Sequence, residues 1–194
     1  MDYPLKRTSQ SGFTLVEMIT TMAIMTLLMT LIFFNFRDAG KNKSARHQIA
    51  NKLMADLRQA QSFALAGSPY LGDFMCGYGI HFSDKTVYVM YAKKPMSGSC
   101  AGINRNFDNG DPVVDTIIIS NKNFEVIDPT GNKPADVFYE PPNPTIFIDN
   151  DPAIAEERYF ISPVFKSVNC ASAADAGECS ALIISNGGTM QLLN

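Results

Sequence analysis

Glu17 is the only charged residue within residues 13–36, a stretch long enough to cross the hydrocarbon core of a bilayer as an α-helix of about 20 residues. A lone carboxylate in such a helix costs roughly 2–3 kcal/mol or more unless it is hydrated, protonated or paired with a cation. Two interpretations follow: Glu17 stays hydrated at the membrane interface of an ordinary signal anchor, or it awaits a positively charged partner. Lys6 and Arg7 precede the stretch, so the positive-inside rule predicts a cytoplasmic N-terminus and a downstream domain on the far side of the membrane.

Four cysteines lie in the part of the chain expected to be exported: Cys76, Cys100, Cys170 and Cys179. An even number of cysteines in an oxidising compartment favours disulfides over free thiols. Three pairings are possible, and we favour Cys76–Cys100 with Cys170–Cys179 because each of these bonds closes a local loop. A zinc site would need cysteines in closely spaced pairs, which this sequence lacks.

Two acidic clusters could supply oxygen ligands for calcium, one with Asp108 and Asp111 and the other with Asp149 and Asp151. Calcium binds six to eight oxygens. However, Asp, Asn, Gly and Pro are also the residues that tight turns require, and Asp111 and Asp151 each precede a proline. Turns are therefore the favoured interpretation, and the sequence assigns no metal and no cofactor.

The residues needed for enzymatic catalysis are scarce. The chain has two histidines, His47 in a helical segment and His81 in an alternating, strand-like segment, and neither accompanies a nucleophile motif. Glu156 and Glu157 are adjacent, so their side chains point apart on a helix or a strand. We expect no active site.

Two kinds of element must position these residues. Apolar residues recur every three or four positions at Ile49, Leu53, Leu57, Ala60 and Ala64, which predicts a continuation of the apolar helix with one buried face. A Gly-Ser-Pro sequence at residues 67–69 predicts the end of this helix.

From residue 77 onward the apolar residues alternate, and Tyr, Val and Phe are frequent, as is typical of strands. Short polar turns at residues 83–85 and 186–188 predict two hairpins. The sequence predicts strands at residues 78–82, 86–91, 115–120, 124–127, 137–139, 145–149, 158–162, 181–185 and 189–193.

The residues from Gly12 to Glu17, Gly-Phe-Thr-Leu-Val-Glu, follow a basic leader and open the apolar run. This arrangement resembles the prepilin-type processing site of type IV pilins and type II secretion pseudopilins. The resemblance implies the α+β pilin fold, in which a long N-terminal helix packs on a C-terminal antiparallel β-sheet domain. The expected divisions are a cleaved leader (1–12), a transmembrane or filament-core helix (13–36), the amphipathic half of that helix (37–67) and a β-rich domain (70–194).

The same resemblance implies a function. A prepilin peptidase would cleave between Gly12 and Phe13, Phe13 would become N-methylated, and Glu17 would neutralise a terminal amine during assembly. The partners would be other subunits and an inner-membrane assembly platform. The protein would cross the inner membrane once, with its β-rich domain in the periplasm or outside the cell, and would serve as a structural subunit rather than an enzyme.

Residues 137–144 and the strand after them resemble the minor pseudopilin of the H-subunit type, although the sequence does not decide between a pilus and a secretion pseudopilus. The alternative function is a membrane-tethered binding module for adhesion or DNA uptake. A tethered enzyme is disfavoured by the missing catalytic residues. The formal net charge is −3 at pH 7, which gives no electrostatic basis for binding nucleic acid.

Overall fold

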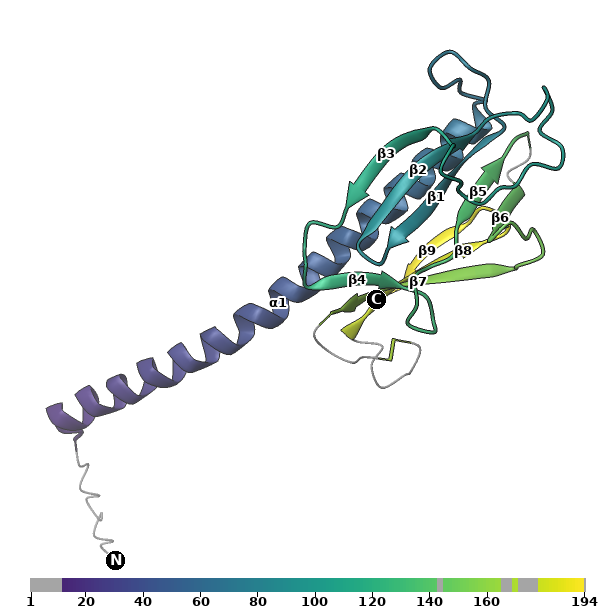
Figure 1. The fold of residues 1–194 in the computed structure, drawn as a ribbon. Coiled ribbons are helices and arrows are strands. Elements are labelled where there is room, and N and C mark those ends of the chain that lie inside the picture. Colours follow the sequence, from purple (N-terminus) through teal and green to yellow (C-terminus); the bar gives the residue numbers. More distant parts are fainter. Residues whose placement is uncertain (1–11, 143–144, 165–168, 171–177, 194) are drawn as a thin grey trace, which may run out of the picture. The chain divides into compact units, whose positions relative to one another are not determined.

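The computed structural model describes residues 12–142, 145–164, 169–170 and 178–193, with backbone alone at residues 33–40. Within these residues one helix, α1 (Leu15–Leu65), precedes two antiparallel sheets (Figure 1). This is the α+β arrangement that the sequence predicts. The chain divides into two units, residues 1–42 and 43–194.

The C-terminal end of α1 is closed by Gly67. This glycine has a φ of 57°, its N–H donates to the carbonyl of Ala64 at 3.0 Å, and the N–H of Ser68 donates to the carbonyl of Phe63 at 3.1 Å. The two bonds form a Schellman motif, in which a left-handed glycine satisfies the last carbonyl groups of a helix. The predicted helix end at residues 67–69 is confirmed.

Sheet 1 has five strands in the order β3-β2-β1-β5-β6, and every neighbouring pair is antiparallel. β1 and β2 form the predicted hairpin. The bounds are β1 (Gly77–Asp84), β2 (Val87–Lys93), β3 (Val113–Ile118), β5 (Val137–Glu140) and β6 (Thr145–Ile148).

Sheet 2 has four antiparallel strands in the order β4-β7-β8-β9. β8 and β9 form the second predicted hairpin, whose turn is closed by a bond of 2.9 Å from the N–H of Gly188 to the carbonyl of Ser185. The bounds are β4 (Phe124–Ile127), β7 (Glu156–Pro163), β8 (Ser180–Ser185) and β9 (Met190–Leu193).

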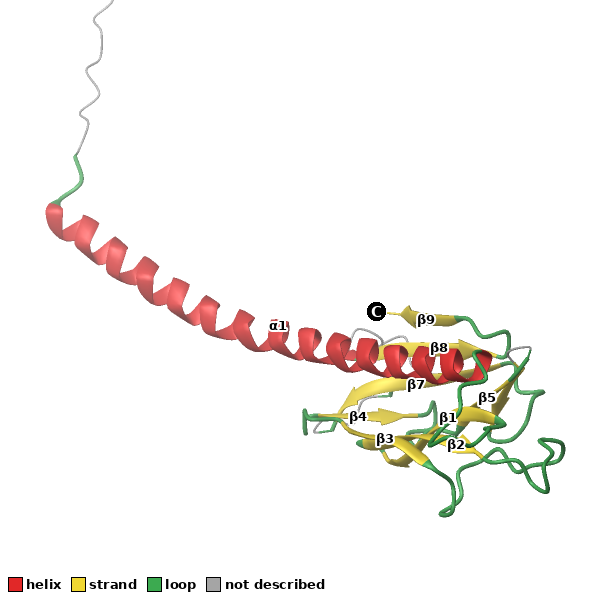
Figure 2. Ribbon diagram, turned by 90° about the horizontal axis from the view of Figure 1, so that it is seen from above, coloured by secondary structure: helices red, strands yellow, loops and turns green. Residues whose placement is uncertain are grey.

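One core joins the two sheets to the helix. In the 43–194 unit, α1 lies over both sheets (Figure 2). Four predicted positions, Leu53, Leu57, Ala60 and Ala64, are buried, and the fifth, Ile49, is half-buried at the edge. The helix also buries Arg46, Ala50 and Asp56, which the apolar spacing did not include. The fully buried members of the core come from all three elements: Leu53 and Leu57 of α1, Ile80, Phe82 and Tyr139 of sheet 1, and Val126, Tyr159 and Leu182 of sheet 2.

A polar group also fixes α1 to sheet 1. Asp56 is 3 % exposed, and its carboxylate accepts hydrogen bonds of 2.6 Å from the Tyr88 hydroxyl and from the Lys52 ammonium. Burial, together with the adjacent carboxylate, raises the pKa of Tyr88 far above its ordinary value. Since a buried carboxylate is stable only when its oxygens are hydrogen-bonded, this contact sets the position of the helix on the sheet.

The outer face of sheet 1 is covered by the chain between β2 and β3. Phe107 of this segment packs on a cluster of Tyr91, Phe138 and Phe147. β1 has a glycine at residue 79 because a β-carbon there would lie 2.7 Å from the ring of Tyr91.

Candidate functional site

Thr14 caps the N-terminus of α1. The backbone N–H of Glu17 donates to the Thr14 hydroxyl at 3.2 Å, and the helix begins at Leu15. A side-chain oxygen that accepts such a bond satisfies one of the free N–H groups in the first helical turn. Phe13 therefore lies directly before an ordered helix start, and its side chain is 79 % exposed.

Glu17 lies in the first turn of α1. The aligned peptide dipoles give a helix N-terminus a partial positive charge, which favours a carboxylate by roughly 0.3–1 kcal/mol. The backbone carbonyl of Glu17 accepts hydrogen bonds from the hydroxyls of Thr20 at 3.0 Å and Thr21 at 2.9 Å. The carboxylate is thus placed at the end of the apolar segment that is most favourable for a negative charge.

The apolar segment that follows is long enough to span a membrane. Residues Leu15–Ile32 have a mean hydropathy of 2.0, and none of this window is buried within the protein. The large apolar residues of this window, and Phe13 just before it, are 54–79 % exposed. Such a surface requires either lipid or other apolar helices around it.

The hydroxyl groups of this segment are satisfied locally. Thr26 donates to the carbonyl of Met22 at 3.0 Å, and Thr30 donates to the carbonyl of Thr26 at 2.7 Å. Polar groups with an internal partner of this kind avoid the penalty of an unpaired donor in hydrocarbon.

The 43–194 unit contains two disulfides, Cys76–Cys100 and Cys170–Cys179, with Cα–Cα distances of 5.4 and 5.7 Å. These are the pairs that the sequence favours. The first joins the start of β1 to the segment that covers sheet 1. The second packs with Ile127 and Phe160 on the outer face of sheet 2.

The first acidic cluster is neutralised by a lysine. The Lys93 ammonium lies 3.0 Å from the Asp108 carboxylate and 2.5 Å from that of Asp111. The hydrogen bond and the charge of Lys93 hold the pKa of Asp108 below its ordinary range. An ammonium therefore occupies the position that a cation would take between these two carboxylates.

The second acidic cluster shapes a turn. Asp149 and Asn150 have φ values of 50° and 64°, and the Asp151 carboxylate accepts a bond of 2.8 Å from the N–H of Ala153. Among the residues that the structure describes, no group of three or more His, Cys, Asp or Glu side chains is arranged to hold a metal ion. The turn interpretation fits the backbone geometry of both clusters.

A polar cavity of about 540 Å³ is lined by Lys133 and by four carboxylates, those of Asp128, Asp136, Asp149 and Glu157. The ring Nδ1 of the half-buried His81 lies 2.7 Å from the Asp136 carboxylate, and His81 stacks on Phe107 with ring centroids 4.8 Å apart. His81 is thus a paired strand residue. Burial, followed by the charges of Asp128 and Asp149, raises the pKa of Glu157 to about 7.

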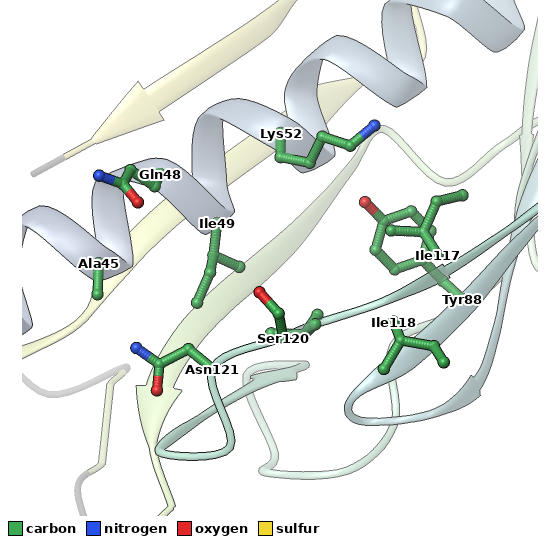
Figure 3. Close-up of a pocket in the computed structure, with 10 residues that line it drawn as sticks. Ala45, Gln48, Ile49, Lys52, Tyr88, Ile117, Ile118, Ser120 and Asn121 are labelled. Carbon is green, nitrogen blue, oxygen red and sulfur yellow. The ribbon is translucent and has the colours of Figure 1, made fainter.

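A second groove, of about 290 Å³, lies between α1 and the end of β3. Ala45 and Ile49 of the helix face Asn121 and Ser120 across it, and Gln48 also belongs to its lining (Figure 3). The groove is mainly apolar, and Ile118 beside it is 68 % exposed.

Sequence reasoning overlooked the cap at Thr14, although a signal for it exists. Thr14-x-x-Glu17 is the capping-box pattern that marks a helix N-terminus. The cavity and the groove had no local signal, because each is assembled from segments far apart in the chain.

A family model for the prokaryotic N-terminal methylation motif matches residues 7–33. The match includes Gly12, Phe13 and Glu17 and extends through the apolar segment. No curated protein and no solved structure matches the chain.

Proposed function

We propose that this chain, which carries the prokaryotic N-terminal methylation motif of type IV pilin-like proteins, is a structural subunit of a type IV pilus or a type II secretion pseudopilus. The observation that supports this proposal is the motif followed at once by an exposed apolar helix. The α+β fold agrees with it. The matched family is a structural motif and not an enzyme family.

In this proposal a prepilin peptidase cleaves between Gly12 and Phe13, and Phe13 is then methylated on its amine. The Thr14 cap supports the assignment, since it leaves Gly12 and Phe13 outside the first helical turn. A peptide bond outside a helix is accessible to a protease without unwinding of the chain.

The test is the intact mass and N-terminal sequence of the protein, isolated from membranes of a host that has an active prepilin peptidase. A mature chain that begins at methylated Phe13 is the expected result. A chain that still begins at Met1 would indicate an ordinary signal anchor and would overturn the proposal.

The assembly charge in this proposal is Glu17. In a bundle of such helices, the carboxylate of one subunit would pair with the Phe13 amine of its neighbour. Moving an apolar helix from lipid into a bundle gains little from the hydrophobic effect, so polar pairs and close packing must set the register. The location of Glu17 in the first turn supports this role, since only one turn separates it from the terminal amine.

We expect Glu17→Ala to be processed and inserted normally but to enter filaments at least about tenfold less often, because the pair of opposite charges is lost. Filament fractions quantified by immunoblot measure the effect. Thr20→Ala is the matched control, since it changes a neighbouring polar residue whose hydroxyl bonds only to its own helix. Wild-type incorporation of Glu17→Ala would refute the role.

We further propose that the protein crosses the inner membrane once, with a cytoplasmic N-terminus and the 43–194 unit in the periplasm or beyond. Lys6 and Arg7 before the span support this orientation, and the two disulfides support an oxidising compartment for the second unit. Its partners would be other subunits and the assembly platform. Its subtype would be the minor subunit of the H type.

A further inference from the structure

Two loops lie together at the C-terminal end of α1, and we call them the distal loops (residues 70–74 and 94–99). Each is closed by paired backbone bonds, between Tyr70 and Asp73 at 3.0 Å and between Met96 and Ser99 at 2.9–3.0 Å. The Lys94 ammonium lies 2.8 Å from the Asp73 carboxylate and joins the loops to each other. The disulfide Cys76–Cys100 holds the two segments together at their base.

The distal loops present apolar side chains to solvent. Leu71 is 87 % exposed, Met96 is 67 % exposed and Phe74 is 59 % exposed. Leu71 also has a φ of 52°, a conformation that the β-carbon of an L-residue disfavours. Neither burial nor a side-chain partner compensates for this conformation within the described part of the chain. Exposed apolar patches and unfavourable backbone conformations of this kind mark interaction surfaces.

The apolar groove between α1 and β3 lies at the other end of the same unit. Ile49 in the groove and Leu65 beside the distal loops are separated by 16 helical residues, or about 24 Å. At about 290 Å³ the groove is at the lower limit for small-molecule sites. It has room for one or two apolar side chains, and its walls are of the same chemical character as the distal loops.

The charges of the two ends are opposite in sign. Near the distal loops three carboxylates, Asp73, Asp108 and Asp111, outnumber the ammonium groups of Lys93 and Lys94 with which they pair.

Around the groove, Lys43, Lys52 and Lys122 are exposed and lie in its lining or within two residues of it. Two carboxylates lie near these lysines: that of Asp56 is buried in its pair with Lys52, and that of Asp115 in β3 lies close enough to Tyr88 to raise the pKa of its hydroxyl. The three ammonium groups therefore outnumber the two carboxylates. A second copy of the chain would therefore meet complementary charge as well as complementary apolar surface.

We propose that the distal loops of one subunit dock in the α1–β3 groove of a second copy, with Leu71 and Met96 as the inserted side chains. The contact joins two different surfaces, and such heterologous contacts generate open rows of subunits when the rotation between copies does not close a ring. This docking contact rests on the proposed function, because a patch this small binds firmly only when the N-terminal helices already hold the subunits side by side.

The test is photo-crosslinking of the full chain in membranes, with a benzophenone amino acid at position 71 and a mixture of light and heavy isotope-labelled protein. We expect light–heavy crosslinks from position 71 to peptides that contain residues 45–52 or 117–121. The control probe is at Ala153, an exposed position distant in sequence from both surfaces. Crosslinks no more abundant than those of the control, or crosslinks that avoid both groove peptides, would overturn the proposal.

Two further variants separate docking from folding. Ile118→Lys places a charge at the groove, and we expect the crosslink yield to fall at least about tenfold, whereas Thr116→Lys, exposed on the same edge strand, should leave it unchanged. Leu71→Asn suits the left-handed conformation, so it should keep or raise the melting temperature while lowering the yield of groove crosslinks from a benzophenone amino acid placed at position 96. A Leu71→Asn protein that pairs like the wild type would contradict the proposal.

The same samples distinguish this contact from the proposed function. Their N-terminal mass reports leader processing, which does not involve the groove. Groove crosslinks in a chain that begins at Met1 would support the contact and refute the pilin-like function. A processed chain without groove crosslinks would support the pilin-like function and refute the contact.

Discussion

Two buried tyrosines of sheet 1 differ in the partner of the hydroxyl group. The Tyr88 hydroxyl donates to the Asp56 carboxylate at 2.6 Å, whereas the Tyr139 hydroxyl has no hydrogen-bond partner among the described residues. Removing one member of a buried pair leaves the other unsatisfied at a cost of about 1–3 kcal/mol, but removing an unpaired group relieves a cost that the fold already bears.

We therefore expect Tyr88→Phe to lower the free energy of unfolding by about 1–3 kcal/mol and Tyr139→Phe to leave it unchanged or raise it. Denaturant titration of the full chain in detergent micelles, followed by circular dichroism, measures both. Equal destabilisation by the two variants would mean that the Asp56 contact does not anchor the helix.

Glu157 makes stability depend on pH. Its pKa is about 7 in the folded protein against an ordinary value of 4.5, because the side chain is partly buried near Asp128 and Asp149. Between these two values the folded state holds a proton that the unfolded state releases. The contribution of Glu157 to the free energy of unfolding is therefore greatest below pH 4.5. It falls as the pH rises toward 7 and is constant above that value.

We expect Glu157→Gln to remove about 1–2 kcal/mol of this pH dependence, a value reduced for the solvent exposure of the side chain. Melting temperatures measured between pH 5 and 8 provide the test, because the folded-state pKa of about 7 lies within this range. Glu156→Gln is the control, since the neighbouring Glu156 is exposed and pairs with Arg158. A wild-type pH profile for Glu157→Gln would rule out this residue as the source.

At the scale of elements, the end of α1 depends on the backbone of one glycine. Gly67 has a φ of 57°, and no atom lies within 4 Å of the position of an added β-carbon. Alanine there is strained by its conformation alone, so Gly67→Ala should cost about 1–2 kcal/mol in unfolding free energy.

Gly110→Ala is the matched control for Gly67→Ala. Its surroundings are equally open and its φ is not left-handed, so its unfolding free energy should stay within about 0.5 kcal/mol of the wild type. Similar losses from both variants in the same denaturant titration would disprove the conformational explanation.

The nine described strands and the end of the helix could be predicted because their signals are local. Alternating apolar residues specify a strand within four to eight residues, and Gly67 or the turn at residues 186–188 marks an end within three. The α+β class follows from the order of these elements. The motif at residues 12–17 was likewise visible in one short segment, as were the favoured cysteine pairs, which each close a nearby loop.

The division into two sheets could not be predicted, because strand pairing depends on contacts between distant segments. β4 follows β3 in the chain but pairs with β7, more than thirty residues later. For the same reason the sequence did not indicate that Lys93 neutralises Asp108 and Asp111, or that Glu157 faces carboxylates from three other segments.

At the scale of the whole molecule, Cys76–Cys100 fixes the segment that covers sheet 1. It closes a loop with a sequence separation of 24 residues, for which loss of the bond costs about 3–4 kcal/mol in the chain-entropy description. We expect Cys76→Ser with Cys100→Ser to lower stability by that amount and to increase hydrogen exchange around Phe107. Cys170→Ser with Cys179→Ser, which opens a separation of only 9 residues, should leave exchange at Phe107 unchanged. Equal exchange at Phe107 in both double variants would contradict this assignment.

The threonine hydroxyls of the apolar segment bond to carbonyls of their own helix, and this has a consequence for the life cycle of the subunit. Because no polar group of the Thr26–Thr30 turn needs an outside partner, the helix surface interacts similarly with fatty-acyl chains and with neighbouring apolar helices. For a subunit that assembles as proposed, the bilayer then acts as a reservoir at nearly the same free energy as the filament. Extraction and return would both need only modest work, so growth and retraction would be set by the machinery that moves the subunits.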